Sequence, residues 1–93
     1  MAATTTEINS YLYNIRKAQS EYGANLSKAQ QLGRTDIECQ MNKFVTLKYM
    51  VRIVIDYFDS DDYENVNFFT TDEIRDVMQH INNLCGTNHM ITL

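Results

Sequence analysis

The stretch Gly33-Arg-Thr-Asp-Ile-Glu38 decides the fold, because one amphipathic run ends and another begins within it. Gly33 predicts a helix end, since glycine readily adopts the left-handed conformation that closes many helices. Thr35 and Glu38 have the spacing of a capping box, in which the Thr hydroxyl accepts from a backbone N–H and the Glu carboxylate accepts from the N–H of the Thr. So short a connection predicts that the second helix folds back antiparallel to the first.

The same capping pattern occurs twice more, from Thr4 to Glu7 and from Thr70 to Glu73. The chain has no proline, so nothing interrupts the runs that follow. Its 93 residues leave room for one domain. The sequence therefore predicts an all-α fold, in which a long antiparallel helical hairpin and a shorter third helix form a three-helix bundle over residues 1–93. The expected helices span residues 5–32, 35–58 and 71–85, and residues 59–69 form an acidic loop.

The first and third runs each have one apolar face. Apolar residues recur at steps of three and four from Ile8 to Leu32, as in a helix that lies along a neighbour. Gly23 weakens this helix by about 1 kcal/mol relative to alanine. The third run repeats the same spacing from Ile74 to Cys85.

The second run is apolar over most of its circumference, which is typical of a helix that is buried on more than one side. One face carries Ile37, Met41, Phe44, Leu47, Val51, Val54, Ile55 and Phe58. The first helix covers one side, and the third is too short to cover the rest. We therefore expect an interface with another molecule. The candidate interface residues are Val45, Tyr49, Met50, Ile53, Tyr57 and Phe68.

Within this run, the segment Tyr49–Phe58 leaves an alternative open. It is rich in β-branched and aromatic residues, which are enriched in strands. The upstream capping box and the three- and four-residue spacing from Ile37 favour a helix.

The acidic loop resembles a calcium loop only at its start. Asp59 and Asp61 stand at the first and third positions, but Glu64 replaces the glycine that permits the turn. Thr70 replaces the glutamate that closes the cage. The loop is therefore interpreted as a solvated linker.

Four side chains of the types that bind zinc are present: Cys39, His80, Cys85 and His89. Their spacing matches no common zinc finger, and the sequence contains no nucleophile or HExxH motif. The paired carboxylates fall in a polar loop or at the exposed start of a helix, without a pocket to separate their pKa values. We expect a non-enzymatic protein without a metal or another cofactor.

Charge is unevenly distributed. Residues 1–55 carry seven Lys or Arg against four Asp or Glu, whereas residues 56–93 carry one against eight. Such asymmetry can hold two parts of the chain together or align copies head to tail, or it can simply keep the protein soluble. Six of the eight basic residues are spread along the first two expected helices and the net charge is −4, so direct nucleic-acid binding is not expected.

The sequence indicates a soluble protein made inside the cell. The N-terminus lacks the basic and apolar regions of a signal peptide. The most apolar stretch, Phe44–Phe58, contains three charged residues and is too short to span a bilayer, so no membrane contact is expected.

Two strings resemble small helical proteins encoded among the structural genes of tailed bacteriophages. They are Tyr11-Leu-Tyr-Asn-Ile-Arg-Lys-Ala-Gln19 and Ile74-Arg-Asp-Val-Met-Gln-His-Ile-Asn-Asn-Leu-Cys-Gly-Thr-Asn88. Both are helix-face and helix-end strings, so the resemblance carries over no functional residue. It implies a virion component of the head, neck or connector.

The function expected is that of a non-enzymatic structural or assembly protein, located in the virion or otherwise in the cytoplasm. Its partners would be further copies of itself, other virion proteins, or both, with no small-molecule substrate. An acidic nucleic-acid mimic that acts as an inhibitor, or a regulatory protein-binding module, is the alternative. A mimic needs carboxylates spaced along one surface, whereas here they are bunched at residues 56–64. A metal-dependent enzyme is a third hypothesis.

Overall fold

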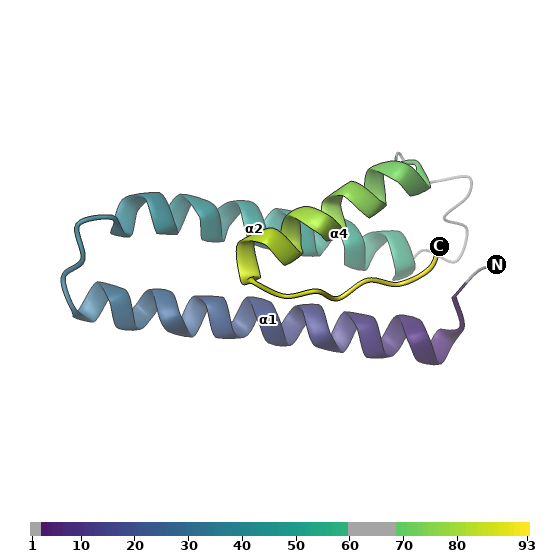
Figure 1. Ribbon diagram of the computed structural model, residues 1–93, viewed down its shortest axis with the longest axis horizontal. Coiled ribbons are helices and arrows are strands. Elements are labelled where there is room, and N and C mark those ends of the chain that lie inside the picture. Colours follow the sequence, from purple (N-terminus) through teal and green to yellow (C-terminus); the bar gives the residue numbers. More distant parts are fainter. Residues whose placement is uncertain (1–2, 60–68) are drawn as a thin grey trace.

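The computed structural model describes residues 3–59 and 69–93. Within these ranges the chain forms three α-helices and no strand: α1 (Thr5–Gln31), α2 (Ile37–Asp59) and α4 (Thr71–Cys85). α1 and α2 lie antiparallel, and α4 crosses the half of the hairpin that lies near the chain termini (Figure 1). The predicted all-α arrangement of three helices is confirmed. The segment Tyr49–Phe58 is helical throughout.

Two of the three predicted capping boxes are present. At α1, the Thr4 hydroxyl accepts from the N–H of Glu7 at 3.2 Å, and the Glu7 carboxylate accepts from the N–H of Thr4 at 3.4 Å. At α4, Thr70 and Glu73 make the same pair of hydrogen bonds, at 3.2 and 3.0 Å. Each box satisfies two backbone donors that the first helical turn leaves unpaired.

The end of α1 also follows the prediction. Gly33 has a φ of +66°, and its N–H donates to the carbonyl of Gln30 at 3.1 Å. The N–H of Arg34 donates to the carbonyl of Ala29 at 3.3 Å. These two bonds define a Schellman motif, which turns the chain out of the helix.

The start of α2 differs from the prediction by two residues. No hydrogen bond joins Thr35 to Glu38 in the part of the chain that the structure describes, so the third capping box is not formed. The helix begins at Ile37, and the carbonyl of Asp36 accepts its early hydrogen bond, from the N–H of Gln40 at 3.1 Å. A local contact explains the difference. The Arg34 guanidinium donates to the Asp36 carboxylate at 3.0 and 2.6 Å, and this contact keeps Thr35 in the turn that precedes the helix.

The core lies between the three helices at the end of the bundle that α4 covers. Its buried members are Tyr11, Leu12, Ile15, Leu47, Val51, Val54, Tyr57, Ile74, Met78 and Ile81. Tyr57 was predicted to lie at an interface, but it is 7% exposed and belongs to this core. Leu32 was predicted to end the apolar face of α1, but it is exposed because it is the C-cap residue, where the chain leaves the helix.

An aromatic stack joins α1 to α2. The rings of Tyr22 and Phe44 lie 5.9 Å apart and within 8° of parallel. Gly23 makes this approach possible, since a Cβ atom there would lie 3.1 Å from Cζ of Phe44. The Tyr22 hydroxyl donates to Oε1 of Gln40 at 3.0 Å. Gly23 therefore contributes to packing as well as weakening the helix.

The C-terminal segment runs back along α1 and is anchored by Asn82, which is 2% exposed (Figure 1). Nδ2 of Asn82 donates to the carbonyl of His89 at 2.9 Å. Oδ1 of Asn82 accepts from the N–H of His89 and from the hydroxyl of Thr87, both at 2.9 Å. These bonds bring Ile91 and Leu93 against the core.

Candidate functional site

The side of α2 that faces away from the core carries a row of exposed apolar side chains. Met41, Val45 and Tyr49 follow one another at intervals of four residues and are 46%, 50% and 70% exposed. At about 100° per residue, Met41 and Tyr49 lie roughly 40° on either side of Val45. Leu47 and Val54, which are fully buried, lie on the opposite side of the helix. We call Glu38, Met41, Val45, Tyr49 and Arg52 the outer stripe.

The two charged members close the row at its ends. Glu38 and Arg52 lie seven residues before and after Val45, which places each about 20° from it around the helix. Both are exposed. Nε of Arg52 forms an ion pair with Oδ1 of Asp56 at 3.1 Å. Glu38 makes no hydrogen bond or ion pair with any residue in 3–59 or 69–93, because the capping role expected of it is not taken up.

An open groove of about 480 Å³ lies beside the outer stripe. Val45, Tyr49 and Arg52 line it on the stripe side, and Gln19 of α1 is among its other lining residues. Nearby, Nζ of Lys48 lies 5.5 Å from the centroid of the Phe44 ring, a cation–π contact. The surface around the stripe is thus apolar at its centre and positive toward its C-terminal end.

The six predicted interface residues do not share one environment in the structure. Val45 and Tyr49 are exposed, as an interface requires. Met50 and Ile53 are half-buried and pack against the core. Tyr57 belongs to the core, and Phe68 lies outside the described residues.

Two members of the outer stripe were assigned other roles from the sequence. Met41 was placed on a different face of the helix from Val45 and Tyr49, and Glu38 was placed in a capping box. The signal that identifies them is their position around the helix relative to Val45, which becomes clear once the buried side of α2 is known.

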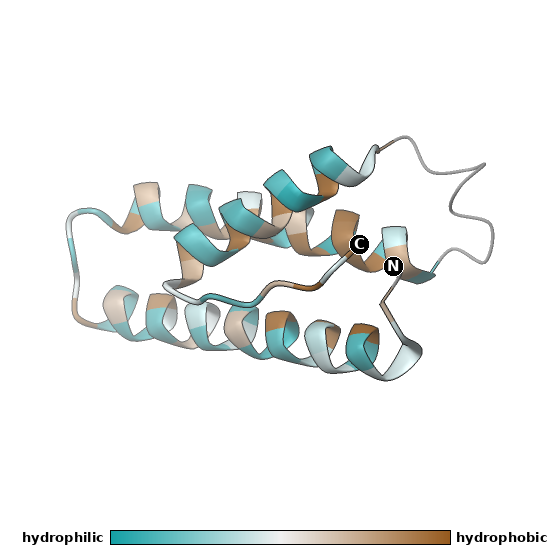
Figure 2. Cartoon of the chain, turned by 45° about the vertical axis from the view of Figure 1, so that its right-hand side comes forward, coloured by the Kyte–Doolittle hydropathy of each residue, from teal (hydrophilic) through white to brown (hydrophobic). Residues whose placement is uncertain are grey.

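The outward side of α4 contrasts with that of α2. Figure 2 shows hydrophilic residues along the outer side of α4. Its exposed residues include Asp72, Glu73, Asp76, Gln79 and His80. A row of exposed apolar residues is therefore a property of α2 and not of every helix in the bundle.

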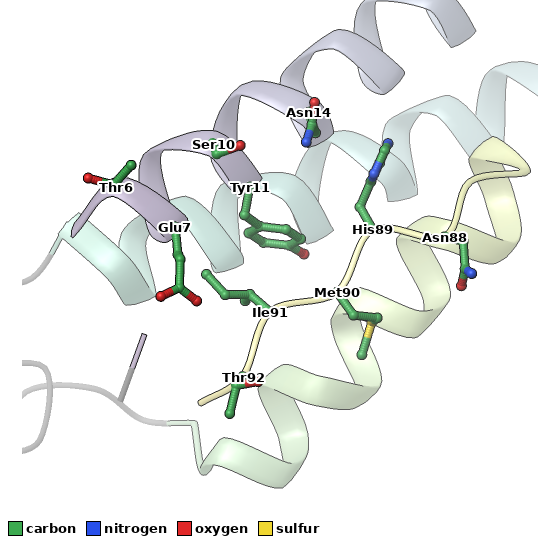
Figure 3. A pocket seen from close by; sticks show the side chains of 10 residues that line it. All are labelled: Thr6, Glu7, Ser10, Tyr11, Asn14, Asn88, His89, Met90, Ile91 and Thr92. Carbon is green, nitrogen blue, oxygen red and sulfur yellow. The ribbon is translucent and has the colours of Figure 1, made fainter. Parts of the chain in front are cut away.

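A second groove, of about 520 Å³, lies between α1 and the C-terminal segment (Figure 3). The hydroxyl of Tyr11 is buried near it and has no hydrogen-bond partner among the described residues. Burial raises the pKa of Tyr11 well above its ordinary value. The Glu7 carboxylate, which also lines the groove, is already committed to the capping box of α1. The C-terminal side of this groove is held by Asn82 of α4, whose side chain hydrogen-bonds the main chain of His89.

The potential zinc ligands are not assembled into a site. Cys39 is exposed on α2, whereas Cys85 is half-buried and packs against the core, where burial raises the pKa of its thiol. The main chain of His89 is held by Asn82, and His80 points outward from α4 as an exposed side chain. Across residues 3–59 and 69–93, no group of three or more His, Cys, Asp or Glu side chains is arranged to hold a metal ion. Most of the acidic loop considered for calcium lies outside these ranges.

Comparisons with protein-family models, with curated proteins and with solved structures find no match to this chain. In the described part of the chain, no helix has the length and apolar character needed to cross a membrane.

Proposed function

We propose that this chain is a non-enzymatic assembly protein that associates with a second copy of itself through the outer stripe of α2. The observation that supports the proposal is the row of Met41, Val45 and Tyr49 on the side of α2 opposite the core. Contiguous exposed apolar surface usually marks an interaction site in a soluble protein. No residue in 3–59 or 69–93 covers it, whereas the outward side of α4 is polar.

The expected strength of association follows from these exposures. Burying a whole Val, Met or aromatic side chain contributes about 1.5–3 kcal/mol. Met41, Val45 and Tyr49 are 46%, 50% and 70% exposed, so two copies that cover them gain roughly 5–10 kcal/mol, against an association cost of at least about 4 kcal/mol. The middle of this range leaves about 3–4 kcal/mol, which corresponds to a dissociation constant on the order of 1 mM. Such a dimer forms where the local concentration is high, as inside a larger assembly.

The larger assembly we propose is the virion of a tailed bacteriophage. The support for it is the resemblance of residues 11–19 and 74–88 to small helical structural proteins of such phages. An antibody against the chain should detect it in purified particles of the phage that encodes it. Its absence from those particles, while infected cells contain it, would contradict this part of the proposal.

Self-association is tested by the mass of the protein in solution. Light scattering at about 1 mM should give a weight-average mass clearly above the 10.8 kDa of one chain. Tyr49→Ala should return the mass to that of a monomer. Tyr13→Ala is the matched control, because Tyr13 lies on α1 and is 66% exposed, against 70% for Tyr49. A monomeric wild-type protein at this concentration would refute the proposal.

A further inference from the structure

The outer stripe is self-complementary, because large apolar side chains flank Val45 on both sides and the two ends carry opposite charges. Val45 stands at its centre, with a large apolar side chain four residues away on each side, Met41 and Tyr49. Seven residues away stand opposite charges, Glu38 on one side and Arg52 on the other. All five side chains are exposed. This is the pattern that a two-fold symmetric contact requires, because in such a contact residue i meets residue j and j meets i.

We propose that two copies pair through antiparallel α2 helices, with Val45 on the two-fold axis and Glu38 of each copy facing Arg52 of the other. This pairing rests on the proposed self-association and specifies its geometry. Met41 of one copy then meets Tyr49 of the second copy, a contact between a thioether and an aromatic ring that is favourable in itself. The two Val45 side chains meet across the axis.

Charge selects the antiparallel arrangement over the parallel one. In a parallel pair in the same register, Glu38 would face Glu38 and Arg52 would face Arg52, and like charges at an interface are unfavourable. The antiparallel pair replaces both repulsions with two attractions. Opposed helix dipoles favour the same orientation.

The side chains concerned are available for this role. Glu38 has no ionic partner within the described residues, so the second copy would supply its first. Arg52 already contacts Asp56, but both side chains are largely solvated, at 76% and 61% exposed. An exposed ion pair of this kind is weak, so Arg52 can also contact Glu38 of the second copy.

Disulfide trapping tests the register. In a Cys39→Ser background, the exposed native thiol is absent and the half-buried Cys85 remains. Val45→Cys places two thiols across the proposed axis, within the Cα separation of about 7 Å that a disulfide tolerates. Thr46→Cys is the matched control, since Thr46 is the next residue and is exposed, but lies about 100° away around α2. Under mild oxidation we expect a covalent dimer from Val45→Cys and little from Thr46→Cys.

Charge exchange tests the orientation, with the rate of this cross-linking as the readout. Glu38→Arg alone or Arg52→Glu alone creates two like-charge contacts and should slow cross-linking by about five- to thirtyfold, the factor that corresponds to a loss of 1–2 kcal/mol. Combining both changes restores opposite charges and should recover the rate to within about threefold. Lys17→Glu and Glu21→Arg on α1 change the net charge equally and should leave the rate unaltered. Circular dichroism checks that each variant keeps its helix content.

The outcomes distinguish this pairing from self-association in general. If the wild-type protein dimerises but Val45→Cys cross-links no faster than Thr46→Cys, or the double charge exchange does not recover the rate, the antiparallel pairing is refuted and self-association stands. If the wild-type protein is monomeric at about 1 mM, both proposals are refuted.

Discussion

Replacing Asn82 by alanine removes the anchor that holds the C-terminal segment on the bundle. The Asn82 side chain makes three hydrogen bonds of 2.9 Å, to the carbonyl and N–H of His89 and to the hydroxyl of Thr87. Each such bond contributes about 0.5–1.5 kcal/mol net, so Asn82→Ala should lower the free energy of unfolding by about 2–4 kcal/mol. A chain of this length has a total stability of about 5–14 kcal/mol, so the loss is a large fraction.

Urea denaturation followed by circular dichroism measures this loss, which corresponds to a fall in Tm of about 10–25 °C for a domain of this size. Amide hydrogen exchange at His89 gives a local readout, because the freed segment exposes that N–H to water. Asn83→Ala is the matched control. Asn83 is exposed, and its Oδ1 accepts only from Gln79 in the described structure, so the change should stay within about 0.5 kcal/mol. Equal effects of the two substitutions, with unchanged exchange at His89, would refute the anchoring role.

Three further substitutions or reagents probe the bundle. Gly33→Val should lower the free energy of unfolding, measured by urea denaturation, by about 2 kcal/mol, because a β-branched residue at a φ of +66° is strained even though no atom crowds the position. A neutral result would show that the turn does not need this conformation. Gly23→Ala should raise the free energy of unfolding by less than half of the roughly 1 kcal/mol expected from helix propensity, because the new Cβ would crowd Phe44. A gain of the full amount would mean that the Phe44 ring moves aside freely. Iodoacetamide at pH 8 should alkylate Cys39 faster than Cys85, because burial raises the pKa of the Cys85 thiol and covers it; equal rates by mass spectrometry would contradict the packing of α4.

The helix ends that depend on nearby residues were predictable from the sequence. The boxes at Thr4 and Thr70 and the left-handed Gly33 involve atoms within five residues of one another, so their spacing along the chain is sufficient. The start of α2 is equally local but was missed. The Arg34–Asp36 ion pair competes with a Thr35 cap, and the spacing of Thr35 and Glu38 does not decide between the two.

Which side of α2 faces outward was harder to predict. A three- and four-residue spacing follows one face only approximately, because four residues advance about 40° beyond a full turn. Because of this drift, Met41 is exposed although it was assigned to the same face as Leu47, and Tyr57 is in the core although it was assigned to the interface. The position of α4 determines which side of α2 is buried, and that position depends on contacts between distant parts of the sequence.

The role of Asn82 had no signal in the sequence. It is a polar residue on α4 that the helical pattern would leave in solvent. It is buried because the C-terminal segment returns over it, and the sequence pattern does not predict that return. The symmetry of the outer stripe, in contrast, is readable from residue numbers once Val45 is known to face outward.

Concentration-dependent NMR shows whether the outer stripe of α2 is the surface through which copies meet. Amide chemical shifts of the ¹⁵N-labelled protein should be compared between dilute samples and about 1 mM, where the expected dimer is populated. We expect the shifts that change to belong to Met41, Val45, Tyr49 and their neighbours on α2. Shifts that do not depend on concentration, or that change instead on the outward side of α4, would contradict it.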